Sequence, residues 1–197
     1  MIAKIAALVQ LGAFYAAYAA KLLILRKQNI RVDLMGKGQK AKGGAALEIT
    51  LKCVTFLVIA AQWGSAIWDK APWSLPVFPA MRVTGLLLML FGLIAFILAM
   101  AAMENNWRAG YSEGQNTELV TKGIYKCSRN PAFLGFDSLY AGCALAFPNP
   151  IHIAVAVTAM VLFHAQILGE EKFLANAFGQ EYLNYKAKTM RYLGRRY

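Results

Sequence analysis

Acidic residues are scarce in this 197-residue chain, which has 10 Asp and Glu against 21 Lys and Arg and a formal net charge of +11. Charged residues make up only 16% and hydrophobic residues 58%, whereas a soluble domain carries about 45–50% apolar and about a quarter charged residues. The composition therefore excludes an ordinary soluble domain. The positive charge suggests nucleic acid, but the basic residues lie at the ends of apolar runs, which is how membrane topology is encoded. We expect the bilayer, and not nucleic acid, as the partner.

Cysteine and histidine are also few. Of the three cysteines, Cys53 and Cys143 fall inside apolar runs and Cys127 lies in a basic segment, which argues against a disulfide framework. We interpret the first two as small buried hydrophobic residues. His152 and His164 are the only histidines, and no Cys/His cluster has the spacing of metal ligands. We predict no metal site.

Long apolar runs are abundant, and their length suits a bilayer core about 30 Å thick. The fourth run is short and contains Asp137, and Pro148-Asn149-Pro150 separates it from the fifth, so these two should form an antiparallel hairpin. We predict an all-α polytopic membrane protein forming a single domain over 1–197, with three spans in 1–103 and a cofactor-binding half in 104–197. The five predicted spans are approximately Ile2–Leu25, Ala46–Trp68, Met81–Met103, Ala132–Phe147 and Ile151–Leu168.

Basic residues favour one side of these spans. Only Lys4, Lys70 and Arg82 lie on one side. Because Lys and Arg are retained on the cytoplasmic side, we predict an outside N-terminus and a cytoplasmic C-terminus, as an odd number of spans requires. The 16 basic residues counted on the predicted cytoplasmic side are Arg26, Lys27, Arg31, Lys37, Lys40, Lys42, Arg108, Lys122, Lys126, Arg129, Lys172, Lys186, Lys188, Arg191, Arg195 and Arg196.

Two stretches on that side carry more polar chemistry than a membrane anchor needs, and the first is Thr117–Gly135. Arg129-Asn130-Pro131 opens the fourth span, and Pro131 suits the first turn of a helix. The free N–H groups of a helix start favour a carboxylate or phosphate, and Arg129 would strengthen that preference with its forked donors. An ordinary helix cap with a headgroup-facing arginine explains the same residues.

The second stretch is Gln166–Arg191, in which Glu170 and Glu171 follow directly after a span. Carboxylates at membrane depth are costly and usually face a polar cavity or a partner. The C-terminal end of a helix is also unfavourable for negative charge. The acid pair therefore needs a basic neighbour or a bound cation, unless it is simply solvated beyond the lipid.

Aromatic residues follow the acid pair. Gly179 is typical of a helix C-cap, with another helix expected from Glu181. Tyr182 and Tyr185 share a face of that helix, as pocket walls or as interfacial tyrosines. Together the two stretches suit an amino-acid-like ligand with both charges, or a sulfonium cofactor with an adenine to stack. The residues alone do not choose the reaction.

In order and spacing these motifs resemble the isoprenylcysteine carboxyl methyltransferase family and the phospholipid N-methyltransferases, over about residues 104–191. The resemblance implies a membrane-embedded S-adenosyl-L-methionine-dependent methyltransferase, with a lipophilic acceptor arriving from the bilayer. It does not assign a catalytic residue. The motifs are Leu119-Val120, Gly123-Ile124-Tyr125, Arg129-Asn130-Pro131-Ala132-Phe133-Leu134-Gly135, Glu170-Glu171-Lys172-Phe173-Leu174 and Phe178-Gly179-Gln180-Glu181-Tyr182-Leu183-Asn184-Tyr185.

By the same resemblance, specific residues are expected to hold the cofactor. The acceptor would meet a smaller and weaker set, Gln166, Tyr182 and Tyr185. The expected cofactor-binding residues are Thr117, Glu118, Leu119, Val120, Tyr125, Arg129, Asn130, Pro131, Ala132, Phe133, Glu170 and Glu171.

Three positions depart from the family pattern. Asn130 replaces its histidine, Phe133 its tyrosine, and Gln166 the arginine that holds a substrate carboxylate in the prenylcysteine-type enzymes. A prenylated protein is therefore not assigned as the substrate, and an amine or another lipid stays open. Two alternatives also stay open: an NADPH-dependent membrane reductase of the sterol reductase type, and a non-catalytic protein that kept the fold. Glu170 and Glu171 favour a sulfonium cofactor over NADPH.

Overall fold

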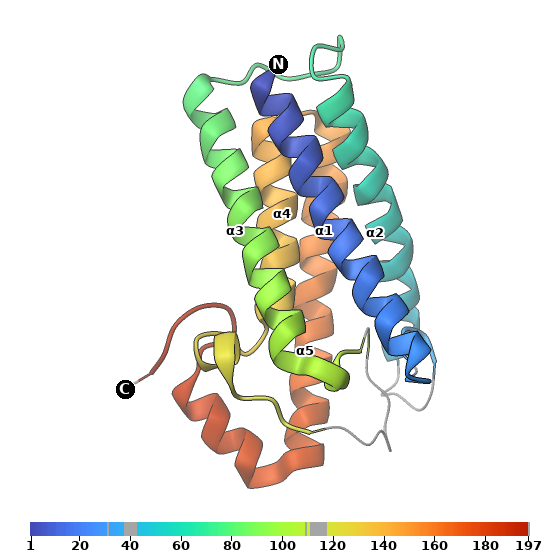
Figure 1. The fold of residues 1–197 in the computed structure, drawn as a ribbon, viewed down its shortest axis with the longest axis vertical. Coiled ribbons are helices and arrows are strands. Elements are labelled where there is room, and N and C mark those ends of the chain that lie inside the picture. Colours follow the sequence, from blue (N-terminus) through green and yellow to red (C-terminus); the bar gives the residue numbers. More distant parts are fainter. Residues whose placement is uncertain (31, 38–42, 109, 111–117, 197) are drawn as a thin grey trace.

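The computed structural model describes residues 1–30, 32–37, 43–108, 110 and 118–196. Within these residues the chain is all-helical, which confirms the predicted fold class (Figure 1). The five long helices agree with the predicted spans to within a few residues at their shared ends, except that the last one continues much further. The elements are α1 (Ile2–Lys27), α2 (Gly44–Ile67), α3 (Pro79–Met103), η1 (Glu104–Asn106), η2 (Gly123–Lys126), α4 (Pro131–Ala146) and α5 (Pro150–Lys188).

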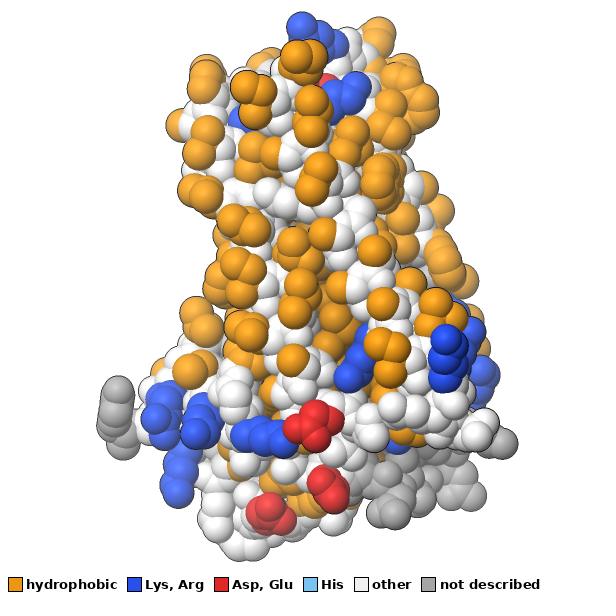
Figure 2. All heavy atoms as spheres, viewed as in Figure 1, with side chains coloured by type: hydrophobic (Ala, Val, Ile, Leu, Met, Phe, Trp, Pro, Cys, Tyr) orange, Lys and Arg blue, Asp and Glu red, His pale blue; other side chains and the backbone are white. Residues whose placement is uncertain are grey.

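Four of these helices, α1, α2, α3 and α5, are long and apolar enough to cross a membrane. Helix α4 has only 16 residues, fewer than the roughly 20 that a span needs. Large apolar side chains point outward along the bundle, for example Phe56 at 64% and Leu87 at 61% exposure. Figure 2 shows these apolar side chains covering the shaft of the molecule, with charged residues gathered towards its ends. This surface suits lipid, and the chain is an integral membrane protein.

Glycines let α3 and α4 approach each other closely. Gly85 and Gly92 of α3 lie against Gly142 and Gly135 of α4, and a Cβ built at Gly92 would be 2.6 Å from the Gly135 carbonyl oxygen. The matching distance from Gly85 to the Gly142 carbonyl oxygen is 2.5 Å. Small residues at such contacts allow backbone packing within a bilayer, where hydrophobic burial drives helix association little. The short α4 is thereby held along α3.

An aromatic cluster joins four helices at the centre of the bundle. Phe14 of α1 stacks on Phe96 of α3 with ring centroids 4.3 Å apart. Phe136 of α4 contacts Phe96 at 4.9 Å and Phe163 of α5 at 5.3 Å. Edge-on and stacked pairs of this kind add to the energy of burial. The cluster sets the register of α4 against α5.

The predicted hairpin between α4 and α5 is confirmed. Asn149 is the N-cap residue of α5, and its side-chain oxygen accepts from the His152 N–H at 2.9 Å. Its Nδ2 donates to Ser65 Oγ at 2.6 Å. This polar turn joins α4 to α5 and ties both to α2. The two helices therefore run antiparallel, as Figure 1 shows.

Helix α5 continues past the other helices and kinks at Gly179, whose φ of 51° and ψ of −124° are not helical. The expectation that a helix ends here is correct only in part, because the helical pieces meet at a kink and not across a loop. Glycine adopts this conformation at low cost. The tail then returns to α4: the Arg129 N–H donates to the Met190 carbonyl at 3.0 Å, and the Gly194 N–H to the Cys127 carbonyl at 2.7 Å.

Candidate functional site

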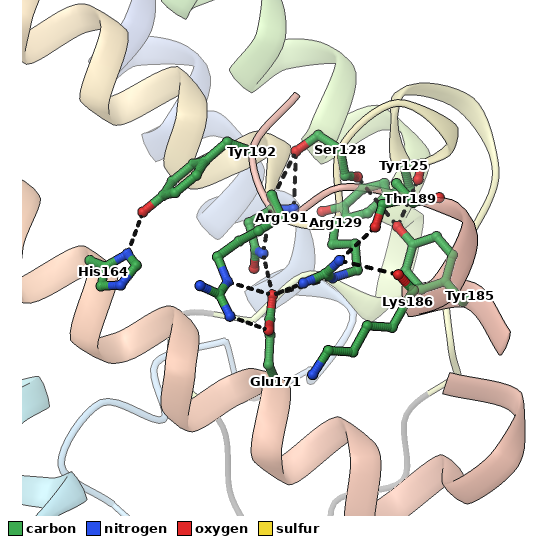
Figure 3. A network of polar contacts seen from close by, with 11 residues as sticks. Tyr125, Ser128, Arg129, His164, Glu171, Tyr185, Lys186, Thr189, Arg191 and Tyr192 are labelled. Atoms are coloured by element: carbon green, nitrogen blue, oxygen red, sulfur yellow. Dashed lines mark hydrogen bonds and ion pairs between the residues drawn. The ribbon is translucent and has the colours of Figure 1, made fainter. Parts of the chain in front are cut away.

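The structure brings the two polar stretches together through a buried ion pair at one end of the bundle. Glu171 of α5 is 4% exposed, and Arg129, just before α4, is 8% exposed. The arginine donates to Glu171 Oε1 from Nε at 3.2 Å and from Nη2 at 2.7 Å (Figure 3). The prediction that the acid pair needs a basic neighbour is confirmed for Glu171.

A second arginine reaches the same carboxylate from the tail. Arg191 donates from Nε to Glu171 Oε1 at 3.1 Å and from Nη2 to Oε2 at 3.0 Å. Asn130 adds a further donor, its Nδ2 lying 3.2 Å from Oε1. Glu171 lies beyond the predicted span, and although burial opposes its charge, the hydrogen bonds from Arg191 and Arg129 hold its pKa below the ordinary value. The carboxylate is therefore ionised at neutral pH.

The remaining donors of this network hold the tail. Arg129 Nη1 donates to the carbonyl of Thr189, and Asn130 Nδ2 lies 3.2 Å from the carbonyl of Arg191. Ser128 Oγ accepts from the Asn130 N–H at 3.1 Å. Arg129 was expected to strengthen anion binding at the helix start, but its donors are directed at Glu171 and at tail carbonyls. Its structural role is to fasten α4, α5 and the tail together.

The start of α4 keeps the features of an anion site without that arginine. Asn130 is the N-cap residue, yet no side-chain cap bond forms, because its amide is directed to Glu171 and the tail. Pro131 has no N–H to satisfy. In the described part of the chain, therefore, no side chain caps the N–H groups of Ala132 and Phe133. Such groups favour a carboxylate.

Glu170 belongs to a second cluster, which joins α5 to α2. Gln166, 2% exposed, donates from Nε2 to Glu170 Oε1 and to Glu48 Oε1, both at 3.0 Å. Glu48 is fully buried, and its Oε2 accepts from the Gly36 N–H at 2.7 Å. Glu48 was not among the residues predicted from the sequence. Its position could have indicated a role, because a carboxylate near the start of an apolar span is costly and usually has a partner or faces a polar cavity.

Three tyrosines line the region between the two clusters. The Tyr185 hydroxyl donates to the Tyr125 carbonyl at 2.7 Å, so it holds η2 against α5. The Tyr182 and Tyr185 rings are 6.3 Å apart, which confirms that they share a face. Burial raises the pKa of Tyr125, and the nearby Tyr185 and Glu170 raise it further. Tyr125 and Glu170 are both among the residues expected to bind the cofactor.

The other expected residues are placed less centrally. Glu118 is exposed, Leu119 and Val120 are half-buried, and Thr117 lies outside the described residues. Tyr182 is 1% exposed, so it supports the site from behind. Ser128, Thr189 and Arg191 also build the site, although the sequence did not single them out. No group of three or more potential metal ligands occurs among the described positions.

A surface hollow of about 280 Å³ adjoins these tyrosines. It lies between η2 and the far part of α5, and Tyr185 and Thr189 form part of its wall. Lys126, Lys188 and Arg195 also line it. The hollow thus has a basic rim and shares Tyr185 with the site.

Comparisons with curated proteins match about half of the chain. Among curated proteins, the chain is 33% identical over 112 residues to the protein-S-isoprenylcysteine O-methyltransferase of Mus musculus, covering 55% of this chain and 40% of that protein. The Saccharomyces cerevisiae protein of the same name is 30% identical over 110 residues, 54% of this chain and 46% of that protein. Protein-S-isoprenylcysteine O-methyltransferase A of Arabidopsis thaliana is 33% identical over 106 residues, 51% and 53% of the two chains.

These matches span about half of each relative's length or less. A sequence model of a family described as phospholipid methyltransferase matches residues 80–181. That range runs from α3 through most of α5 and contains Arg129, Asn130, Glu170 and Glu171. It is more than half of the 197 residues, and the chain therefore belongs to the phospholipid methyltransferase family.

Proposed function

We propose that the protein is a membrane methyltransferase that takes its methyl group from S-adenosyl-L-methionine and transfers it to a lipophilic acceptor. One observation carries the proposal. The Arg129–Glu171 ion pair joins the two family motifs into one polar site, and that site lies at the end of an apolar bundle. A water-soluble cofactor and a membrane-dissolved acceptor can both reach such a place.

The residues present suit the cofactor. Its carboxylate would bind the uncapped N–H groups of Ala132 and Phe133. Glu170, which accepts from Gln166, offers carboxylate oxygens for its amino or hydroxyl groups. The rings of Tyr125 and Phe133, with Leu119 and Val120, would surround the adenine, and Glu118 would border the same site.

The chain's contribution to the reaction would be mainly positional. The bound cofactor supplies a sulfonium methyl group, and the residues around it hold the acceptor's nucleophile in line with that methyl. The buried Arg129–Glu171–Arg191 network keeps α4 and α5 at a fixed spacing while this happens. Its role is to preserve geometry and not to touch the reacting atoms.

The acceptor is proposed to be an amine or another uncharged or cationic lipophile. Gln166 brings no positive charge, and its amide already donates to Glu48 and Glu170. A substrate carboxylate would meet those two glutamates and not an arginine. We further propose that this end of the bundle faces the cytoplasm and that the N-terminus lies outside, as the distribution of basic residues predicts.

Ligand-dependent thermal melting of the purified full chain tests this proposal. S-adenosylhomocysteine should raise the melting temperature, and NADPH should not. Glu170→Gln should reduce the shift, whereas Glu104→Gln, at an exposed ion pair with Lys122, should leave it unchanged. Absence of any shift with S-adenosylhomocysteine would contradict the proposal.

The membrane reductase is the second candidate, and one observation favours it. The hollow beside Tyr185 is rimmed by Lys126, Lys188 and Arg195, and a nicotinamide cofactor needs converging positive charge for its phosphates. A reductase would show a rise in melting temperature with NADPH, and the variants Arg195→Gln and Lys126→Gln would remove that rise. Retention of the S-adenosylhomocysteine shift in those variants would exclude it.

A further inference from the structure

An ionisable group lies on the lipid-facing side of α5, away from the site described above. His164 is exposed, and it lies in a stripe of outward apolar residues on one face of the helix. Val157 is 54%, Val161 63% and Leu168 45% exposed. A polar side chain in such a stripe is costly unless it serves a purpose.

The tail supplies a partner for this histidine. The Tyr192 hydroxyl is 2.7 Å from His164 Nδ1, and the two rings are stacked with centroids 6.1 Å apart. Figure 3 shows Tyr192 directed away from the Glu171 network, towards His164 on α5. The neighbouring Leu193 is 60% exposed. The tail thus places one tyrosine against the membrane face of α5.

Asp137 lies at the same depth on the facing helix. It follows Asn130 by seven residues on α4, and His164 precedes Glu171 by seven on α5. Seven residues are about 10 Å along a helix and return to nearly the same face. Because Asn130 and Glu171 are hydrogen-bonded across the seam, Asp137 and His164 both lie about two turns deeper along α4 and α5.

The Oδ1 atom of Asp137 is buried and has no hydrogen-bond partner among the residues that the structure describes. The residue as a whole is half-buried. A buried carboxylate oxygen without a partner, at the same membrane depth as a polar pair, suits a ligand that donates hydrogen bonds.

We propose that Asp137 and the Tyr192–His164 pair form a binding site for the hydrogen-donating head, an amine or a hydroxyl, of a molecule dissolved in the bilayer. This inference deepens the proposed function, on which it rests, because such a molecule would be the methyl acceptor. Asp137 accepts a hydrogen bond from the head, and the Tyr192–His164 pair offers a second polar contact. The apolar body lies along the stripe of α5.

Photo-crosslinking tests the site in the full chain, reconstituted in phosphatidylcholine nanodiscs, whose lipid head has no hydrogen to donate. The probe is dodecylamine with a diazirine in its chain. It should label peptides of α4 and α5, and dodecylamine and dodecanol should compete, whereas dodecanoate should not. Equal competition by dodecanoate would overturn the proposal.

Variants then locate the site. Asp137→Leu should lower labelling about tenfold, the loss expected for one hydrogen bond to a charged group. The control Thr158→Val alters another exposed polar residue of α5 and should leave labelling unchanged. If Asp137→Leu fails to fold, Asp137→Asn serves instead, and it should weaken binding of the amine probe more than binding of dodecanol. Tyr192→Phe should lower labelling several-fold. Labelling at the wild-type level in both Asp137 variants would overturn the proposal.

The same samples separate this inference from the proposed function. Asp137→Leu should keep the melting shift with S-adenosylhomocysteine, because Asp137 lies one turn beyond Phe133 and is not among the residues proposed to hold the cofactor. Asp137-dependent labelling without any S-adenosylhomocysteine shift would refute the proposed function and leave the binding site standing. The reverse result would refute the binding site alone.

Discussion

Removal of the Glu171 carboxylate should destabilise the protein more than any other single loss of charge at this end of the bundle. The carboxylate receives donors from Arg129, Arg191 and Asn130. Glu171→Ala would leave Arg129 buried and without a counter-charge. Breaking a buried pair from one side costs about 3–5 kcal/mol.

The structure places this cost near the lower end of that range. The side chain of Arg191 is 32% exposed and that of Arg129 only 5%. Water therefore takes over part of the contact with Arg191, and exposed pairs contribute only about 0–1 kcal/mol. We expect a loss of about 3 kcal/mol, mostly from the uncompensated Arg129.

Thermal melting of the purified chain measures this effect. For a chain of this size, about 3 kcal/mol corresponds to a fall of roughly 6–12 °C in Tm. Glu104→Gln is the matched control, because its pair with Lys122 is exposed on both sides, at 65% and 63%, and its Tm should stay at the wild-type value. A Glu171→Ala variant that melts together with wild type would refute the reasoning, since the buried arginine would then need no partner.

The remaining predictions concern pH, helix packing and the second cluster. The pKa of Glu171 is below its ordinary 4.5, so its contribution to the free energy of unfolding should be constant above pH 4.5 and should fade as the pH falls through the folded-state pKa. Melting temperatures measured over a pH series should show this loss in wild type but not in Glu171→Ala. Gly92→Ala should cost about 1–3 kcal/mol, because its Cβ would be 2.6 Å from the Gly135 carbonyl. Gly64→Ala, whose Cβ meets only a side chain at 3.7 Å, should be neutral in the same melting assay; equal effects would contradict the close-packing account. Gln166→Leu should cost about 1–3 kcal/mol by leaving a buried glutamate of α2 without that donor, and an unchanged Tm would show that the bond is dispensable.

Hydropathy and turn residues were enough to predict the helices, because a span leaves a long apolar run and Pro148 and Pro150 interrupt one. The meeting of the two polar stretches was predicted because both lie on the same, predicted cytoplasmic, side of the spans. The choice of acid was not, because neighbouring residues of a helix point about 100° apart. Only the register of α5 against α4 shows that Glu171, and not Glu170, forms the ion pair with Arg129.

Other features depend on tertiary structure that one sequence does not contain. Each of α3 and α4 has two glycines seven residues apart, namely Gly85 and Gly92 in α3 and Gly135 and Gly142 in α4. This spacing does not reveal which helix each glycine contacts. The role of Arg191 depends on the tail turning back after α5, which no local pattern predicts. Long-range contacts of this kind are decided by the packing of the whole bundle.

Cofactor crosslinking tests the central claim most directly. The full chain would be irradiated with S-adenosyl-L-methionine carrying a radiolabelled methyl group, digested and mapped, with S-adenosylhomocysteine or NADPH as competitor. Label should appear in peptides from both 118–135 and 166–191, and only S-adenosylhomocysteine should remove it. Label confined to other parts of the chain, or removed equally by NADPH, would contradict a single cofactor site built by these two stretches.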